Sequence, residues 1–242
     1  LQENESALSF AQRRLYFLYQ YDPSVTYFNL PVELGMNGVL DVALMQQAVQ
    51  LVTARHRIYR STYHVRNGIP LQRFEAGRDI TLQVTDLLGI PAQEQEQRLA
   101  ALRQQAVYTP FVLESELPLR LHLIRQAEEV QSLLLVFHHI ATDEWSSQQL
   151  IEELSATYRQ LRQQQATPLA EGLPTENGSA AKALPVENAR GDSSAAATAA
   201  ECAEAAVSYF DFVQWQQQRM ESGGYEVARS FWQDHLAGAE PV

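Results

Sequence analysis

The sequence predicts an α/β (α+β) fold in which a mixed β-sheet packs against helices. Segments typical of strands and of helices follow one another without strict alternation along the 242 residues, which favours a mixed sheet over a doubly wound parallel one. Residues 133–137 are five consecutive apolar residues, as in a strand that is buried on both faces. The sequence lacks the glycine-rich fingerprints of dinucleotide and phosphate sites.

Apolar periodicity places the individual strands and helices. Alternating or continuous apolar stretches predict strands over residues 30–38, 59–66, 69–74, 80–85, 119–125 and 130–137. Apolar stripes at helical spacing predict helices over residues 6–20, 41–56, 91–106, 146–161, 205–220 and 225–236. No internal repeat is visible in this order of elements.

Turn and cap residues mark the ends of several of these elements. Asn67-Gly68 tolerates the positive φ angles of a tight turn, so we expect it to join the strands on either side into an antiparallel hairpin. Pro91 suits the first turn of a helix, where its missing N–H would have no partner. The expected helix caps are Ser6 or Ser9, Asp41, and Ser146 with Gln149 at capping-box spacing.

Residues 165–203 differ in composition from the rest of the chain, being rich in Ala, Ser, Gly and Pro with scattered charge. Almost no large apolar residue lies in this segment, so it cannot bury enough surface to offset its loss of conformational entropy. We therefore expect a disordered insertion within one domain that comprises residues 1–164 and 204–242.

Bulk properties limit the expected partners and location. A net charge of −11 repels nucleic acid and anionic lipid, so neither a nucleic acid nor a membrane is an expected partner. No apolar run approaches the roughly 20 residues that span a bilayer, and the amino terminus lacks a basic region followed by a hydrophobic one, so we expect a cytoplasmic protein. The single Cys202 cannot form an internal disulfide and has no cation close in sequence to stabilise a thiolate.

The candidate functional segment is LLLVFHHIATDEWSS, residues 133–147. The expected buried strand ends here in titratable side chains, which are His138, His139, Asp143 and Glu144. A loop at the end of a buried strand is where a rigid scaffold often presents reactive groups. Adjacent strand residues point to opposite faces of a sheet, so only one of the two histidines can face a given cleft.

The residues alone leave several interpretations of this segment open. Both histidines can be satisfied core residues, with Asp143 capping a turn. A metal site lacks an obvious third ligand, because adjacent histidines diverge and no HExxH or CxxC is present. Ser146 and Ser147 lack the GxSxG elbow that presents a nucleophile. One neutral histidine can instead accept a proton from an attacking amine or hydroxyl, or hold that group by a hydrogen bond.

Several segments resemble one known family. HHIATDEW, residues 138–145, resembles the HHxxxDG motif of condensation domains of non-ribosomal peptide synthetases, which belong to the chloramphenicol acetyltransferase-like superfamily. Further segments match that family's first, second and fourth motifs and the element that closes its amino-terminal half, in the expected order: LSFAQRRLYFL at 8–18, RHRIYRSTY at 55–63, YFDFVQWQ at 209–216 and FWQDHLAG at 231–238. The resemblance implies the amino-terminal lobe of a two-lobed domain, whose carboxy-terminal lobe would begin just beyond Val242.

The resemblance also implies a function. In this family the active site lies in a tunnel between the lobes, and donor and acceptor peptidyl carrier proteins deliver thioesters on phosphopantetheine from its two ends. We therefore expect an acyltransferase that forms an amide bond, with no cofactor bound directly and no metal. The alternatives are a catalytically degenerate domain that binds carrier proteins or recruits a tailoring enzyme, an epimerisation domain, and a related acyltransferase with a soluble or alcohol acceptor.

Roles for individual residues are carried over by position. His139 matches the histidine to which the family assigns the catalytic or substrate-positioning role. His138 and Asp143 match supporting residues, and Arg60 matches an arginine that is the candidate for an ion pair with Asp143. Glu144 stands where the family has Gly, so it adds bulk and charge beside His139 and is a candidate gate for acceptor access.

The second motif departs from the family pattern at two further positions. Arg57 stands where Glu is usual, and Tyr59 stands where Leu is usual. The DxxxxD pattern of heterocyclisation domains is absent, so cyclodehydration is not expected.

Overall fold

A four-stranded mixed sheet forms the centre of the structure, a computed structural model that describes residues 4–166 and 207–238. Its strands, in spatial order, are β2 (Asn29–Asn37), β7 (Val130–His138), β6 (Leu119–Ala127) and β5 (Leu82–Asp86). The neighbours pair antiparallel except β5 and β6, which are parallel. The predicted mixed sheet is thereby confirmed. Nearly all of the insertion predicted at 165–203 lies outside the described residues, as does Cys202.

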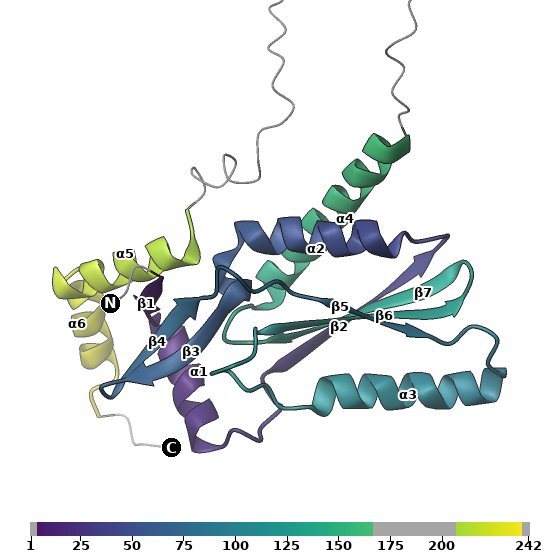
Figure 1. Ribbon diagram of the computed structural model, residues 1–242. Helices are drawn as coiled ribbons and strands as arrows, with labels where there is room; N and C mark the ends of the chain where they lie inside the picture. The colour runs from purple at the N-terminus through teal and green to yellow at the C-terminus, as the bar shows by residue number, and fades with distance from the viewer. Residues whose placement is uncertain (1–3, 167–206, 239–242) are drawn as a thin grey trace, which may run out of the picture.

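Helices cover both faces of this sheet (Figure 1). Helices α2 (Val42–Arg55) and α4 (Glu144–Ala166) lie on one face, and α3 (Ala92–Tyr108) lies on the other. Strand β7 is central, and the apolar side chains of 133–137 are each at most 2% exposed. The prediction of a strand buried on both faces is confirmed, since this strand packs against helices on both sides.

A second, three-stranded antiparallel sheet lies beside the first. Its order is β1 (Glu5–Ala7), β4 (Ile69–Phe74) and β3 (Ser61–Arg66). Asn67 and Gly68 both have positive φ angles, 53° and 76°, as the predicted hairpin turn requires. The sequence did not predict that the hairpin would leave the mixed sheet and pair with β1 instead.

Several predicted element boundaries are corrected by local hydrogen bonding. Helix α1 (Phe10–Tyr21) is capped by Ser9, whose Oγ accepts the N–H of Gln12, whereas Ser6 lies in β1. The residues before β3 form a short 3-10 helix, η1 (Arg57–Arg60), so the strand begins two residues later than predicted.

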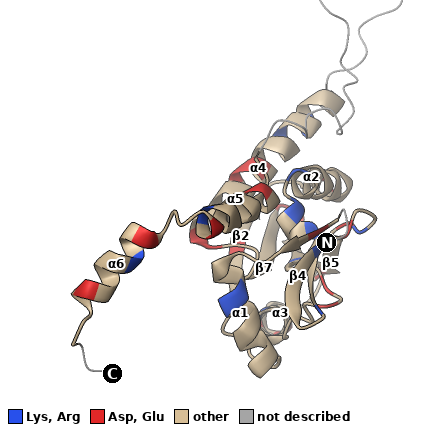
Figure 2. Ribbon diagram, turned by 90° about the vertical axis from the view of Figure 1, so that its left-hand side faces the viewer, with Lys and Arg blue, Asp and Glu red and all other residues tan. Residues whose placement is uncertain are grey.

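The last two helices extend from the body of the structure. Helix α5 (Tyr209–Glu221) begins with a capping box between Ser208 and Asp211, and it lies against β1 and the start of α1. Helix α6 (Glu226–His235) stands away from the sheets (Figure 2), and none of its residues is buried. No helix within the described residues is long and apolar enough to cross a membrane.

Candidate active site

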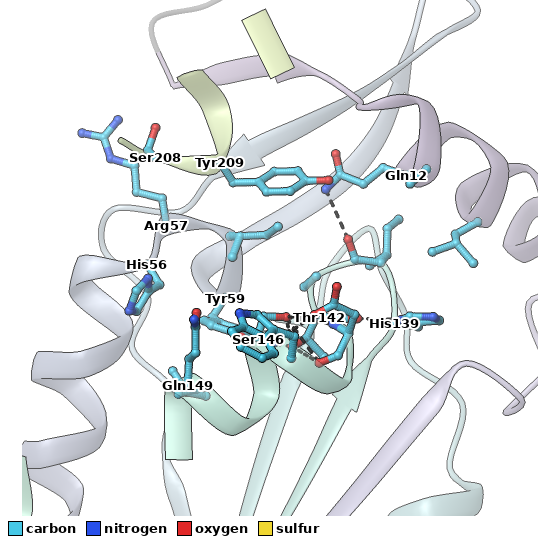
Figure 3. Close-up of a pocket in the computed structure, with 18 of the residues that line it drawn as sticks. Gln12, His56, Arg57, Tyr59, His139, Thr142, Ser146, Gln149, Ser208 and Tyr209 are labelled. Atoms are coloured by element: carbon cyan, nitrogen blue, oxygen red, sulfur yellow. Dashed lines mark hydrogen bonds between the residues drawn. The ribbon is translucent and has the colours of Figure 1, made fainter. Parts of the chain in front are cut away.

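The end of β7 delivers the two histidines to different surroundings, as predicted. His138 is 2% exposed, whereas His139 is half-buried and lines a cavity of about 690 Å³. The cavity wall also includes residues from α1, the end of α2, η1, the start of α4 and the residues around Ser208 (Figure 3). Of the two histidines, His139 alone is therefore placed to meet a ligand in this cavity.

The hydrogen bond of His139 defines its tautomer. Nδ1 lies 2.6 Å from the backbone carbonyl oxygen of Thr142. A carbonyl oxygen can only accept, so Nδ1 carries a proton and donates it. In the neutral imidazole Nε2 is then the atom with the free lone pair. This is the atom that can take a proton or a hydrogen bond from a substrate.

His138 is enclosed and supports the loop. Its Nδ1 accepts a hydrogen bond from the backbone N–H of Ile140 at 3.1 Å, and its ring packs edge-on against Phe111 and Tyr19, with centroid distances of 5.6 and 6.4 Å. Burial, with smaller contributions from the positive charges of His139 and Arg120, lowers the pKa of His138 to about 4. The ring is therefore neutral at pH 7, and Nδ1 remains available as an acceptor.

Asp143 caps helix α4. Its Oδ1 accepts hydrogen bonds from the backbone N–H and the Oγ of Ser146, at 2.8 and 2.6 Å, and its own N–H donates to the Oγ of Ser146 at 2.9 Å. These bonds lower the pKa of Asp143. The predicted capping box between Ser146 and Gln149 is wrong: the helix begins at Glu144, because a carboxylate three residues before Ser146 is a strong cap at the positive end of a helix.

The expected ion pair between Arg60 and Asp143 is also wrong. Nη2 of Arg60 lies 3.2 Å from Oδ1 of Asp79, and the guanidinium donates to the carbonyl oxygens of Arg78 and Ala76 at 2.8 and 2.7 Å. These acceptors on the loop after β4 match the planar fork of a guanidinium that is largely buried. Arg60 therefore fastens that loop, and Asp143 is satisfied by Ser146.

Two residues that sequence reasoning did not single out join the site to α1 and α5. Gln12, 1% exposed, donates from Nε2 to the carbonyl oxygen of Ile140 at 3.3 Å and to Oε1 of Gln72 at 3.2 Å. The hydroxyl of Tyr209 lies 2.8 Å from Oγ of Ser9, and Tyr209 lines the cavity. The signal for Gln12 in the sequence was its place inside the first family-like motif, residues 8–18.

Charged side chains occupy other parts of the cavity wall. Arg14 and Arg57 line it and make no ion pair within the described residues, whereas Glu153 accepts a hydrogen bond from His56 at 3.0 Å and lies 3.6 Å from Arg55. In Figure 3, Arg57 and Ser208 lie on the opposite side of the cavity from His139. The cavity wall thus combines two histidines, His56 and His139, with two arginines, Arg14 and Arg57, that make no ion pair within the described residues, although Arg57 lies near enough to Asp211 to interact with its carboxylate electrostatically.

The departure at position 144 lies at the rim of the cavity. Asp143 and Trp145 line the cavity, whereas Glu144 between them is exposed and is not part of its wall. Across residues 4–166 and 207–238, no group of three or more His, Cys, Asp or Glu side chains is arranged to hold a metal ion.

Comparison with known proteins identifies the family. The model of the condensation domain family matches residues 2–174. One of the linear gramicidin synthase proteins of Brevibacillus parabrevis is 30% identical over 235 residues, which are 97% of this chain and 4% of that protein. The isonitrile lipopeptide synthase of Mycobacterium tuberculosis is 39% identical over 153 residues, which are 62% of this chain and 6% of that protein. The chain thus spans a few per cent of the length of these relatives.

Solved structures show the same fold. The starter condensation domain of rhizomide synthetase RzmA matches 98% of this chain and 48% of its own length, with a TM-score of 0.72 and 18% identity. The first condensation domain of the calcium-dependent antibiotic synthetase matches the same shares with a TM-score of 0.69 and 20% identity. The chain spans about half the length of these solved domains. With the family model matching most of its length, the chain belongs to the condensation domain family of non-ribosomal peptide synthetases.

Proposed function

We propose that this chain is the amino-terminal half of a condensation domain that, with a second half, joins a thioester donor to an amine acceptor. The observation that carries this proposal is the tautomer of His139, whose Nε2 is left free in the cavity by the bond from Nδ1 to Thr142. The amine nitrogen bonds to the thioester carbonyl carbon, the carbon–sulfur bond breaks, and the departing sulfur ends as a thiol. Nε2 receives the proton that the attacking amine loses or orients that amine by a hydrogen bond.

The partners proposed for this reaction are donor and acceptor carrier proteins that bear their substrates on phosphopantetheine. Tethering both substrates in one site raises their effective concentration, so orientation supplies much of the rate. Arg14 and Arg57 on the cavity wall support this proposal, because a phosphopantetheine arm carries a phosphate group. A structure of the rhizomide synthetase starter domain was solved in complex with C8-CoA, and coenzyme A contains the same arm.

Replacing His139 by Ala in the complete two-lobed domain tests the catalytic assignment. With loaded carriers we expect amide formation to fall by about 10²- to 10⁴-fold, the range for loss of a positioned acid–base group. His122→Asn is the matched control, because His122 is half-buried elsewhere and its Nε2 makes no hydrogen bond within the described residues. Unchanged product formation in His139→Ala would remove the assignment.

A catalytically degenerate domain that binds carriers or recruits a tailoring enzyme is the second candidate, and Glu144 is the residue that favours it. Its exposed carboxylate stands at the rim of the cavity where the family has Gly, so we propose it as a gate for acceptor access. Glu144→Gly is expected to raise the rate of amide formation, with Glu144→Gln separating charge from bulk. If no amide forms with Glu, Gly or Gln at position 144, the result would support a catalytically degenerate domain.

A further inference from the structure

We infer that Tyr59 is a positioning residue, whose hydroxyl holds Thr142 and thereby fixes the orientation and tautomer of His139. The inference rests on the proposed function of His139. The hydroxyl of Tyr59 lies 3.1 Å from Oγ1 of Thr142, and the carbonyl oxygen of that same threonine accepts the Nδ1 proton of His139 at 2.6 Å. Tyr59 is thus linked to His139 through a single intervening residue, Thr142.

Counting protons gives these hydrogen bonds a single direction. The carboxylate of Asp143 can only accept, so the Oγ of Ser146, 2.6 Å away, donates its one proton to it. Ser146 then has no proton left for Thr142, so Oγ1 of Thr142 donates its own proton, to Oγ of Ser146 at 2.9 Å or to the carbonyl oxygen of Asp143 at 3.3 Å. Thr142 is left to accept at Oγ1, and the hydroxyl of Tyr59 is the donor in reach. The chain of donors therefore begins at Tyr59 and ends on the helix cap.

Burial makes it hard for water to replace these hydrogen bonds. Tyr59 is 3% exposed and Thr142 is 5% exposed. Burial also raises the pKa of Tyr59, so the phenol keeps the proton that it donates. If this donor is removed, Oγ1 of Thr142 is left with an acceptor site that solvent reaches poorly.

Because Arg60 and Asp143 do not form the expected ion pair, Tyr59 provides the link between η1 and the loop that carries His139. Arg60 turns toward Asp79, so it does not join η1 to the loop that carries His139. The neighbouring Tyr59 makes that connection instead, through Thr142. A leucine at position 59 would fill space against Phe137, whose ring centroid is 6.0 Å from that of Tyr59, but it would have no hydroxyl to donate.

The test separates the hydroxyl from the packing of the ring. Tyr59→Phe keeps the ring, and Thr142→Val removes the acceptor hydroxyl while keeping the carbonyl that meets His139. Tyr158→Phe is the matched control, because this buried tyrosine also makes one hydrogen bond, to the backbone N–H of Asp41 at 3.0 Å, and does not line the cavity. The readout is the ¹⁵N spectrum of His139 in the 242-residue chain, in which the two tautomers have different ring nitrogen shifts.

We expect the ratio of Nδ1–H to Nε2–H tautomer to fall by roughly two- to tenfold in both Tyr59→Phe and Thr142→Val, the equivalent of one lost hydrogen bond. The rate of amide formation by the two-lobed domain is expected to fall by a similar factor, and Tyr158→Phe to change neither. A tautomer ratio in Tyr59→Phe and Thr142→Val that matches the control overturns the inference. If the wild-type domain makes no amide while the tautomer ratio still shifts, the proposed function fails and the positioning role stands.

Discussion

At the scale of single residues, the two adjacent histidines differ because their surroundings differ. His139 has one nitrogen fixed by a carbonyl and the other free in the cavity, whereas His138 is enclosed by aromatic rings. His138 is the last residue of β7, whereas His139 lies in the turn that follows the strand, so the two side chains meet different surroundings. One residue is thus placed for chemistry and its neighbour for support of the loop.

The buried state of His138 predicts a pH-dependent stability. The ordinary pKa of 6.5 applies to the unfolded chain and falls to about 4 on folding, so the unfolded state binds more protons between these values. The contribution of neutral His138 to the free energy of unfolding is fully present above pH 6.5. It is lost as the pH falls toward 4, and the loss amounts to about 3 kcal/mol. Urea denaturation at pH 7 and pH 4.5 measures most of this loss.

His138→Asn is the variant that isolates this effect, because an amide oxygen can still accept from the N–H of Ile140 but does not titrate in this range. It should retain the smaller pH dependence that comes from His64 and His122, whose pKa values burial also lowers. If the variant loses as much stability at pH 4.5 as the wild-type chain, the assignment to His138 is wrong.

At the scale of elements, the start of α4 joins the site to the fold. The reciprocal hydrogen bonds of Asp143 and Ser146 fix the first turn of the helix, and the same loop carries the carbonyl oxygen that binds His139. Helix α1 holds the loop from the other side, through the bond from Gln12 to the carbonyl oxygen of Ile140. The loop that carries His139 is therefore held by two helices and by Tyr59.

The partners of Arg60 and Asp143 predict that these two residues act independently. Asp143→Ala should lower the free energy of unfolding by about 1 kcal/mol, as for loss of a helix cap. Arg60→Ala should destabilise the chain by releasing the loop of Asp79, and the double variant should be additive within about 0.5 kcal/mol. Denaturation of the four proteins in this cycle measures the coupling. A coupling energy well above that limit would show that Arg60 and Asp143 interact, as the sequence led us to expect.

Local sequence predicted most of the elements, because periodicity and turn residues are local signals. The strand over 133–137 and the Asn67-Gly68 turn are examples. The start of α4 was misplaced because Ser146 has capping-box spacing both to Gln149 and to Asp143. The partner of Arg60 could not be predicted, since it depends on where the loop of Asp79 lies in space. The contact of Tyr59 with Thr142 joins residues 83 positions apart and has no local signature.

At the scale of the whole molecule, the chain exposes an apolar surface on its last two helices. The exposed large apolar side chains on these helices and at the end of the second one are Phe212, Trp215, Met220, Val227, Phe231, Trp232 and Leu236. Single exposed apolar residues are common on proteins, but several large ones on two successive helices, the second of which stands away from the sheets, indicate an interaction site. Because the chain spans about half the length of solved condensation domains, we propose that the other half covers this surface.

Truncating one of these side chains should weaken the association of the two halves. Burial of a large aromatic side chain contributes about 1.5 to 3 kcal/mol, so Trp232→Ala should raise the dissociation constant for a separately produced second half by about 10-fold or more. Gln233→Ala is the control on the same helix, since this exposed side chain is polar. Isothermal titration calorimetry measures both. Equal dissociation constants for the wild-type chain and Trp232→Ala would place the second half elsewhere, because a buried indole cannot be lost without cost.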